Sequence, residues 1–335
     1  MTAAGGATDG HGTRQTIAVT GEALIDFVAG TDGRFAPRLG GGPFNTARTI
    51  GRLGGAPAFL GRLSADRFGR LLRDSLGTDG VTLAVPEQAC LPTTLALVDV
   101  DAAGLPRYRF YLDATSAPAV DYPALARALP AGVTALHAGS LALAAEPIAT
   151  SIDRLIAADL PPGTLLMIDP NCRPEVIADR QAYLTRLSRI LRRADVVKVS
   201  VEDLDYLAPG TPAPDAAAAL LGQGPVLVLL TDGPHPARAF LRGEVISAEV
   251  PAVTVADTVG AGDAFGGAFL AWWSRSGLTR SDLRQPAPVQ GALRAAAEVA
   301  ALTCTRVGAE PPWLAEVRDR PGWRTGSAAG SVPPG

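Results

Sequence analysis

The sequence contains few of the residue types that most metal, redox and covalent chemistries require. Of 335 residues, only three are cysteine and three are histidine. The cysteines, Cys90, Cys172 and Cys304, are odd in number and far apart. Their spacing excludes a CxxC zinc or redox pair and favours a reducing compartment. With so few histidines, a His-rich metal site is also excluded.

Lysine is almost absent, and neither sign of charge dominates the chain. Lys198 is the one lysine among 30 basic residues, and 33 acidic residues leave a formal net charge of −3. A chain of this balance has no electrostatic footprint for phosphate backbones, so we expect no nucleic-acid partner. Any mechanism that requires a lysine must use Lys198.

Long apolar runs and targeting signals are missing as well. No window approaches 18 consecutive apolar residues, and residues 1–15 lack both a basic segment and an apolar one. We therefore expect a cytoplasmic protein that has no membrane partner. Residues 1–14 and 325–335 are aperiodic mixtures of small residues, which predict disordered tails. With 47% hydrophobic residues, the remaining chain can bury a large core.

Between the tails, short apolar runs alternate with stretches of helical period. The apolar runs lie at 16–20, 133–139, 163–169, 194–200 and 224–232, and amphipathic stretches lie around 144–158, 179–193 and 213–222. Continuous apolar runs separated by helices are typical of buried parallel strands. The pattern predicts an α/β fold with a doubly wound, mostly parallel sheet.

A second pattern occupies 23–38 and 81–112, where apolar and polar residues alternate. Alternation is typical of strands with one solvated face. We expect these two inserts to form a small β lid on one side of the α/β body.

Polar residues follow the apolar runs at the point where each predicted strand ends. They are Glu22 and Asp26; Ser140; Asp169, Asn171 and Arg173; Ser200 and Asp203; Thr231, Asp232 and Gly233. Ligands of open parallel sheets bind beyond the carboxyl ends of the strands, so this distribution predicts one common cleft.

The segment DTVGAGDAFGGAF (257–269) predicts an anion-binding helix start. It follows a strand-like piece at 250–255 and opens a helical pattern. Gly260, Ala261 and Gly262 let backbone N–H groups approach an anion, and the helix dipole favours negative charge there. Asp263 falls in the first turn, beside whatever the amides hold. The plainer alternative is a glycine-rich turn with Asp263 as a cap.

The segment LGGGPFNTARTIGRLGG (39–55) predicts a second glycine loop that enters a helix. Gly40 and Gly41 permit close backbone approach, and Asn45 offers an amide donor and acceptor from the first turn. These groups suit a polyhydroxylated ligand. A glycine loop with no ligand remains the alternative.

Together these segments resemble the PfkB (ribokinase) family of carbohydrate kinases, and within it the bacterial fructokinases. The resemblance covers roughly residues 16–312. The matching segments, in the family's order, are GEALIDF (21–27), GGGPFNTARTIGRLGG (40–55), YRFYLDAT (108–115), DPNCRP (169–174), KVSVEDLDYL (198–207), DTVGAGDAF (257–265) and LTCTRVGAEPP (302–312). The resemblance implies a ribokinase-like kinase domain over residues 15–324.

The resemblance also implies roles for individual residues. Asp263 matches the catalytic base, and the amides of Gly260, Ala261 and Gly262 match the anion hole. The positions that match sugar-binding residues are Asp26, Gly40, Gly41 and Asn45, with Phe110 on the lid surface above the sugar.

The nucleotide and metal positions depart from the family pattern. Its Asn-x-x-Glu motif, which organises Mg²⁺ and phosphate, reads Ser200, Val201, Glu202, Asp203 here. The nucleotide loop Thr-x-Gly-x-x-Gly reads Thr231 and Gly233, but Pro236 stands in place of its last glycine. Monovalent-cation positions fall on Asp257, Val259, Thr303 and Gly308, whereas Pro312 replaces a serine ligand of ribokinases.

These matches predict an ATP-dependent sugar kinase that uses Mg²⁺ and, at the cation positions, K⁺. Neither a P-loop, nor protein-kinase motifs, nor a dinucleotide fingerprint, nor a GxSxG elbow is present. The predicted substrate is fructose, with 2-keto-3-deoxygluconate, ribose and nucleosides as alternatives. Because of Arg173, the sugar acid 2-keto-3-deoxygluconate remains an alternative substrate: a guanidinium can bind a carboxylate as well as an ATP phosphate. A non-catalytic sugar-binding regulator is the alternative of another class, and pairing of the lid faces predicts a homodimer.

Overall fold

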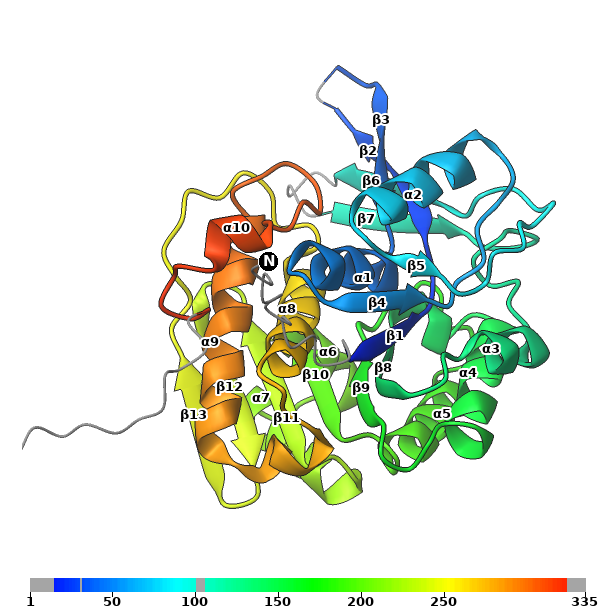
Figure 1. The fold of residues 1–335 in the computed structure, drawn as a ribbon. Helices are drawn as coiled ribbons and strands as arrows, with labels where there is room; N and C mark the ends of the chain where they lie inside the picture. Colours follow the sequence, from blue (N-terminus) through cyan, green and yellow to red (C-terminus); the bar gives the residue numbers. More distant parts are fainter. Residues whose placement is uncertain (1–14, 31, 101–105, 324–335) are drawn as a thin grey trace, which may run out of the picture.

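A nine-stranded sheet forms the centre of the computed structural model, which describes residues 15–30, 32–100 and 106–323 (Figure 1). Its strands, in spatial order, are β13 (Glu244–Ala248), β12 (His235–Leu241), β11 (Leu227–Asp232), β10 (Val196–Ser200), β9 (Leu165–Asp169), β8 (Val133–Gly139), β1 (Thr16–Thr20), β4 (Ala56–Phe59) and β5 (Thr82–Leu83). The strands from β11 to β5 are parallel, while β12 and β13 add an antiparallel edge. The predicted doubly wound, mostly parallel sheet is therefore confirmed.

Helices cover both faces of this sheet and bury its apolar side chains. One face shares a core with α1 (Gly42–Arg52), α2 (Arg67–Thr78), α8 (Ala261–Arg275) and α9 (Pro286–Thr303). The other face packs against α3 (Tyr122–Ala128), α4 (Ile148–Ala158), α5 (Arg180–Leu191), α6 (Val201–Leu207) and α7 (Ala213–Leu220). Strand β1 is apolar at successive positions because both of its faces are buried: Ile17 and Val19 pack into the first core and Ala18 into the second. The short elements are η1 (Ser140–Leu143), η2 (Leu221–Gln223), η3 (Arg280–Arg284) and α10 (Leu314–Val317).

A separate four-stranded sheet stands over one end of the main sheet, at the top of Figure 1. Its order is β3 (Phe35–Gly40), β2 (Leu24–Ala29), β6 (Leu95–Val100) and β7 (Pro106–Tyr111). This sheet corresponds to the predicted β lid, but its second part begins at Leu95 and not, as the sequence pattern predicts, at residue 81. Residues 82–83 form β5 at the edge of the main sheet, so the lid begins at β6. Residues 101–105 lie outside the described residues.

The prediction of a strand at 250–255 is wrong. That stretch runs as irregular chain between β13 and α8. Pro251 has no backbone N–H group to donate to a neighbouring strand. Val255 is 58% exposed, so the alternating apolar residues do not form a buried face.

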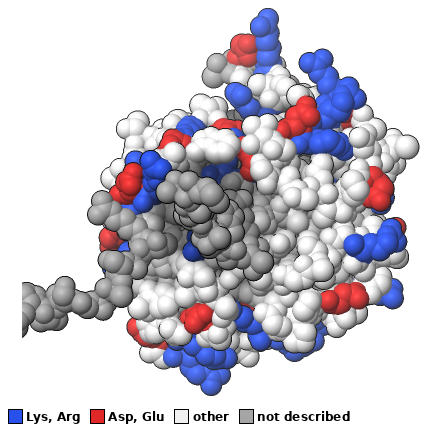
Figure 2. All heavy atoms as spheres, viewed as in Figure 1, with Lys and Arg blue, Asp and Glu red and all other residues white. Residues whose placement is uncertain are grey.

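The predicted tails, 1–14 and 325–335, lie outside the described residues. Within the described part of the chain, no helix is both long and apolar enough to cross a membrane. On the face drawn in Figure 2, acidic and basic side chains are interspersed around the rim, with uncharged residues between them.

Candidate active site

The carboxyl ends of β1, β8, β9 and β10 open into a cavity of about 240 Å³. The lid sheet, the start of α1 and the start of α8 form its other walls. The sequence-predicted residues that line it are Asp26, Gly41, Asn45, Phe110, Arg173, Val259, Gly260, Gly262 and Asp263. The cleft expected from the strand ends thus brings together residues from segments more than 200 positions apart in the chain.

Asp263 lies in the first turn of α8 and is held by α1. The Asn45 side chain donates from Nδ2 to Asp263 Oδ2 at 2.9 Å, and the Thr46 hydroxyl donates to the Asp263 carbonyl at 3.3 Å. Burial raises the pKa of the Asp263 carboxyl, and the Asn45 hydrogen bond and the charges of Lys198 and Arg173 oppose that rise. A carboxylate with a raised pKa, aimed into a cavity, is suited to accept a proton.

The helix start beside Asp263 has the geometry of an anion site. Gly260 is the N-cap of α8 in the left-handed region, with φ of 77°, where a side chain is disfavoured. A Cβ at Gly260 would also lie 2.4 Å from the Ala309 Cβ. The first-turn N–H groups of a helix have no intrahelical acceptor, so that of Gly262 is placed for an anion, whereas the Ala261 amide donates to the Thr258 carbonyl at 3.3 Å.

Asp26, on β2 of the lid sheet, approaches the glycine loop that precedes α1. A Cβ at Gly40 would lie 2.1 Å from Asp26 Oδ2, so this approach requires glycine. At Gly41, φ is 108° and a Cβ would lie 2.6 Å from the Glu22 carbonyl oxygen. Burial, followed by the charge of Asp263, raises the pKa of Asp26 to about 7. The two carboxyls thus face one cavity and disfavour each other's ionisation.

Arg173 enters the cavity from the loop after β9. Its guanidinium donates to the carbonyl oxygens of Cys172 and Asn171 at 3.0 and 3.3 Å and lies over the Tyr108 ring at 6.0 Å. Tyr108 stacks on Phe110 with ring centroids 5.8 Å apart. The lid therefore presents an aromatic surface with a cation beside it.

Lys198 and Glu22 also line the cavity; Glu22 was among the polar residues expected at the cleft, but no role there was predicted for either residue. Lys198 Nζ lies 3.1 Å from Asp169 Oδ2, and both side chains are only 4% exposed. The same ammonium lies 2.9 Å from where a Cβ of Gly262 would be. Glu22 accepts hydrogen bonds from the Gly42 and Ala142 amides, and burial raises its pKa to about 7. The available signal for Glu22 was its position at a strand end; Lys198 lies in the middle of β10, and its signal was that it is the one lysine of the chain.

Two non-glycine residues at the cavity hold positive φ angles. Ser140 has φ of 59° and Asn171 has φ of 38°, and both line the cavity. Such conformations cost free energy and persist where surrounding structure imposes them, which is common at ligand sites.

The predicted nucleotide and magnesium residues lie beside the cavity and not in its lining. Asp203 forms a capping box with Ser200: its Oδ2 accepts from the Ser200 amide at 2.8 Å and its Oδ1 from the Cys172 amide at 2.6 Å. Both carboxylate oxygens of Asp203 are thus engaged by backbone, whereas Glu202 is exposed. Thr231 pairs with Ser200 across β10 and β11.

Gly233 and the predicted monovalent-cation residues other than Val259 lie outside the cavity lining. Gly233 forms the turn between β11 and β12 with φ of 52°. Asp257 joins two loops, since its Oδ1 accepts from the Val259 amide at 3.1 Å and its Oδ2 from the Gly308 amide at 2.8 Å. The Thr303 hydroxyl is buried and donates to the Val299 carbonyl at 2.8 Å. Among the residues described, no group of three or more His, Cys, Asp or Glu side chains is arranged to hold a metal ion.

Comparison with known proteins extends over most of the chain. Residues 14–316 match the family model described as pfkB family carbohydrate kinase. Fructokinase-1 of Oryza sativa subsp. japonica is 34% identical over 318 residues, which cover 91% of this chain and 97% of the relative. The fructokinase of Rhizobium leguminosarum bv. trifolii is 33% identical over 263 residues, covering 76% and 78% respectively.

Solved structures resemble the fold at similar coverage. A fructokinase with bound ATP from Xylella fastidiosa superposes with a TM-score of 0.83 at 32% identity, covering 91% of this chain and 97% of that one. A fructokinase from Vibrio cholerae O395, in its fructose, ADP and calcium ion bound form, gives 0.78 at 28% identity, covering 88% and 94%.

Proposed function

The chain belongs to the pfkB family of carbohydrate kinases, and we propose that it transfers the γ-phosphoryl group of ATP to the primary hydroxyl of fructose. The family resemblance expected from the sequence is confirmed by the family match and by the curated fructokinases. The chain is therefore a sugar kinase enzyme. One observation carries the proposal: Asp263 lies at a helix N-terminus and faces, across one cavity, a second carboxyl on the lid.

Asp263 is the proposed general base. A sugar hydroxyl in the cavity donates its proton to the Asp263 carboxylate as its oxygen attacks the phosphoryl group. Asn45 keeps the carboxylate aimed into the cavity, since its Nδ2 binds Oδ2 and leaves Oδ1 of Asp263 toward Gly42. The raised pKa of Asp263 strengthens it as a base, because burial disfavours its charged form.

The first-turn amides of α8 and Lys198 are proposed to stabilise the transferring phosphoryl group. Catalysis of this transfer depends on positioning and on neutralising charge more than on covalent chemistry. Gly260 and Gly262 present backbone N–H groups at the positive end of the helix dipole, and the Ala261 amide beside them must share its donation to the Thr258 carbonyl. The Lys198 ammonium is fixed by Asp169 directly behind Gly262.

Asp26, Asn45 and the lid are proposed to bind the sugar. The carboxyl of Asp26 accepts hydrogen bonds from sugar hydroxyls, and Gly40 and Gly41 let the backbone approach the ring. Asn45 Oδ1 is buried and has no partner among the described residues, so it can accept from a third hydroxyl. The aromatic pair that includes Phe110 covers the sugar and excludes water, which limits wasteful ATP hydrolysis.

Ser200, Thr231 and Gly233 are proposed to contact ATP at the carboxyl ends of β10 and β11. When bound with the nucleotide, Mg²⁺ would supply positive charge against the phosphates. Of the two acidic residues expected to organise it, Glu202 fits a metal-bound water shell, because it is exposed and Asp203 is engaged by two amides.

A monovalent cation such as K⁺ is proposed between the loops that Asp257 joins. The proposed donors are oxygens: the carbonyls of Val259, Thr303 and Gly308, and the Asp257 carboxylate, whose two oxygens would have to bind the ion while they accept from the Val259 and Gly308 amides. Oxygen donors suit a hard cation. When bound, the ion would supply positive charge behind the N-terminus of α8.

A substrate panel tests this proposal. ADP release from MgATP should be fastest, as kcat/KM, with fructose, and slower with ribose, a nucleoside and 2-keto-3-deoxygluconate. Arg173 favours the sugar acid as a second candidate, because its guanidinium lines the cavity and can bind a carboxylate. A preference for the acid that is lost in Arg173→Ala would establish that candidate. No ADP release with any sugar would instead indicate a non-catalytic regulator.

Assembly and location complete the proposal. We propose that residues 15–324 form one kinase domain and that its exposed lid residues Tyr111 and Phe35, 50% and 44% exposed, are covered in a homodimer. Sedimentation should give twice the chain mass, and a monomer would contradict the dimer. The free cysteines suit a reducing cytoplasm.

A further inference from the structure

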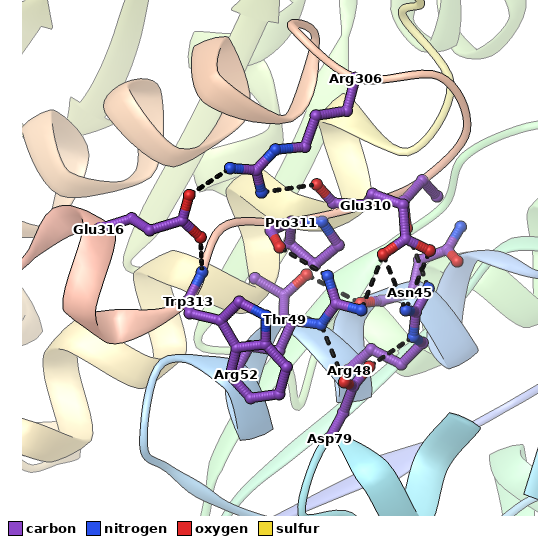
Figure 3. Close-up of polar contacts among 11 residues, drawn as sticks. Asn45, Arg48, Thr49, Arg52, Asp79, Arg306, Glu310, Pro311, Trp313 and Glu316 are labelled. Carbon is purple, nitrogen blue, oxygen red and sulfur yellow. Dashed lines mark hydrogen bonds and ion pairs between the residues drawn. The ribbon is translucent and has the colours of Figure 1, made fainter. Parts of the chain in front are cut away.

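Two arginines one turn apart on α1 reach across the molecule to the chain segment that follows α9. Arg48 Nε binds Asp79 Oδ2 at 2.6 Å, and its other nitrogens bind the Ala309 carbonyl at 3.0 Å and both Glu310 carboxylate oxygens at 3.1 Å. Arg52 binds Asp79 Oδ1 at 2.9 Å and Glu310 Oε2 at 2.7 Å. Figure 3 shows the two guanidinium groups between the two carboxylates.

This cluster is balanced in charge and largely removed from solvent. The side chains of Arg48 and Asp79 are 4% and 1% exposed, that of Arg52 is 10% exposed, and that of Glu310 is 45% exposed. Buried charges persist only when they are paired and hydrogen-bonded, and bidentate arginine contacts also fix orientation. The cluster therefore holds α1 and residues 309–311 in one relative position.

The segment that the arginines hold lies directly behind the anion site. A Cβ at Gly260 would lie 2.4 Å from the Ala309 Cβ, so the two backbones pack as closely as glycine allows. The neighbouring Gly308 amide donates to Asp257 at 2.8 Å. Any shift of Ala309 must move the loop that sets the N-cap of α8.

Helix α1 also contacts the first turn of α8 directly. Asn45, three residues before Arg48, binds the Asp263 carboxylate at 2.9 Å. Thus α1 contacts the base directly through Asn45 and contacts the loop behind the anion site through Arg48 and Ala309.

We propose that Arg48, together with Glu310, is a positioning residue for phosphoryl transfer, which aligns the N-cap of α8 with the base Asp263. Arg48 does not line the cavity and acts through Ala309 and Gly260. The proposal rests on the proposed kinase reaction. A mutation far from the reacting atoms that misplaces a catalytic group by about 1 Å can lower the rate about 100-fold. We therefore expect the loss of the Arg48 contacts to lower kcat.

Three variants test the proposal: Arg48→Gln, Arg48→Lys and Glu310→Gln. We expect kcat to fall about 10- to 100-fold in Arg48→Gln and Glu310→Gln, while the dissociation constant of fructose, measured calorimetrically, changes less than twofold. The Arg48→Lys variant keeps a charge toward Glu310 and should recover part of kcat. If the arginine and the glutamate act as one unit, the double variant should be no slower than the slower single variant.

Matched controls separate positioning from general stability. Arg189→Gln removes an exposed ion pair to Asp153 and should leave kcat unchanged. Leu155→Ala removes a fully buried side chain from the other face of the sheet and should lower the melting temperature without changing kcat per folded molecule. Should Arg48→Gln fail to fold, Arg48→Lys and the half-exposed Glu310→Gln carry the test.

An unchanged kcat in the variants that fold, or equal losses of kcat and fructose affinity, would overturn the positioning role. Failure of the proposed substrate has a different signature, because the unmodified enzyme would then be inactive with fructose. In that case the same variants are assayed with the sugar that the panel identifies.

Discussion

Asn45 Nδ2 donates to Asp263 Oδ2 at 2.9 Å across a sequence separation of 218 residues. This hydrogen bond joins the first turn of α1 to the first turn of α8, so the two glycine loops of the sequence meet at one carboxylate. Asn45 lowers and burial raises the pKa of Asp263, and the net rise leaves a base that one neighbouring residue orients.

Asp263→Asn should lower kcat by about 10²- to 10⁴-fold, because the variant keeps the shape of the side chain and loses the proton acceptor. Fructose affinity should change little. Steady-state kinetics and calorimetric titration measure the two quantities. The half-buried Asp153→Asn on α4, outside the cavity, serves as the control, and near-normal turnover of Asp263→Asn would contradict the assignment.

Fructose affinity should increase as pH rises from 6 to 8. The pKa of Asp26 is raised to about 7, by burial first and then by Asp263, so the carboxyl is mainly protonated at pH 6 and mainly ionised at pH 8. The ionised form accepts hydroxyl hydrogen bonds through both oxygens. The dissociation constant should fall up to roughly tenfold per pH unit below the pKa. Binding to Asp26→Asn should be weak and independent of pH, and a flat profile for the unmodified protein would rule out this role.

Lys198→Met should lower the free energy of unfolding by about 3–5 kcal/mol at pH 8, because it leaves Asp169 buried without its partner. At pH 6 the loss should be smaller. Burial raises the pKa of Asp169 to about 7 even with Lys198 present, so without the ammonium the carboxyl escapes its charge by binding a proton. Urea unfolding at both pH values measures the difference. The double variant Lys198→Met/Asp169→Leu should recover stability, and equal losses at pH 6 and pH 8 would argue against this account.

Gly260→Ala should lower kcat roughly 10- to 100-fold, since the added methyl group would meet Ala309 and shift the N-cap of α8. Gly277→Ala is a matched control: its φ is 69°, as strained as that of Gly260, but no atom lies within 4 Å of the added Cβ. The control should lose about 1–2 kcal/mol of stability and keep its activity. Equal activity of the two variants would show that the contact with Ala309 is unimportant.

Glu202→Gln should raise the Mg²⁺ concentration needed for half-maximal rate and leave stability unchanged. Asp203→Ala should instead lower the free energy of unfolding by about 1–3 kcal/mol, because it leaves the Ser200 and Cys172 amides without their acceptors. Magnesium titrations and urea unfolding of both variants separate the two effects. A raised Mg²⁺ requirement in Asp203→Ala alone would reverse the assignment.

The sequence by itself determined the architecture and most of the cavity lining. Buried parallel strands must be apolar on both faces, so runs such as TIAVT at 16–20 identified the sheet and its direction. Because all parallel strands end at one edge, the polar residues after those runs had to converge. Glycine is required where backbones approach closely, and for that reason the two glycine segments marked the site.

Only the tertiary structure decided how these parts are coupled. Helical and strand periods report which face of an element is buried, but they contain no information about partners far away in the chain. Thus the Lys198–Asp169 pair, the Asn45–Asp263 hydrogen bond and the contact of Arg48 with Ala309 were not predictable from local pattern. The role of Asp203 was decided in the same way, because whether a carboxylate is free for a metal depends on which backbone amides the fold brings to it.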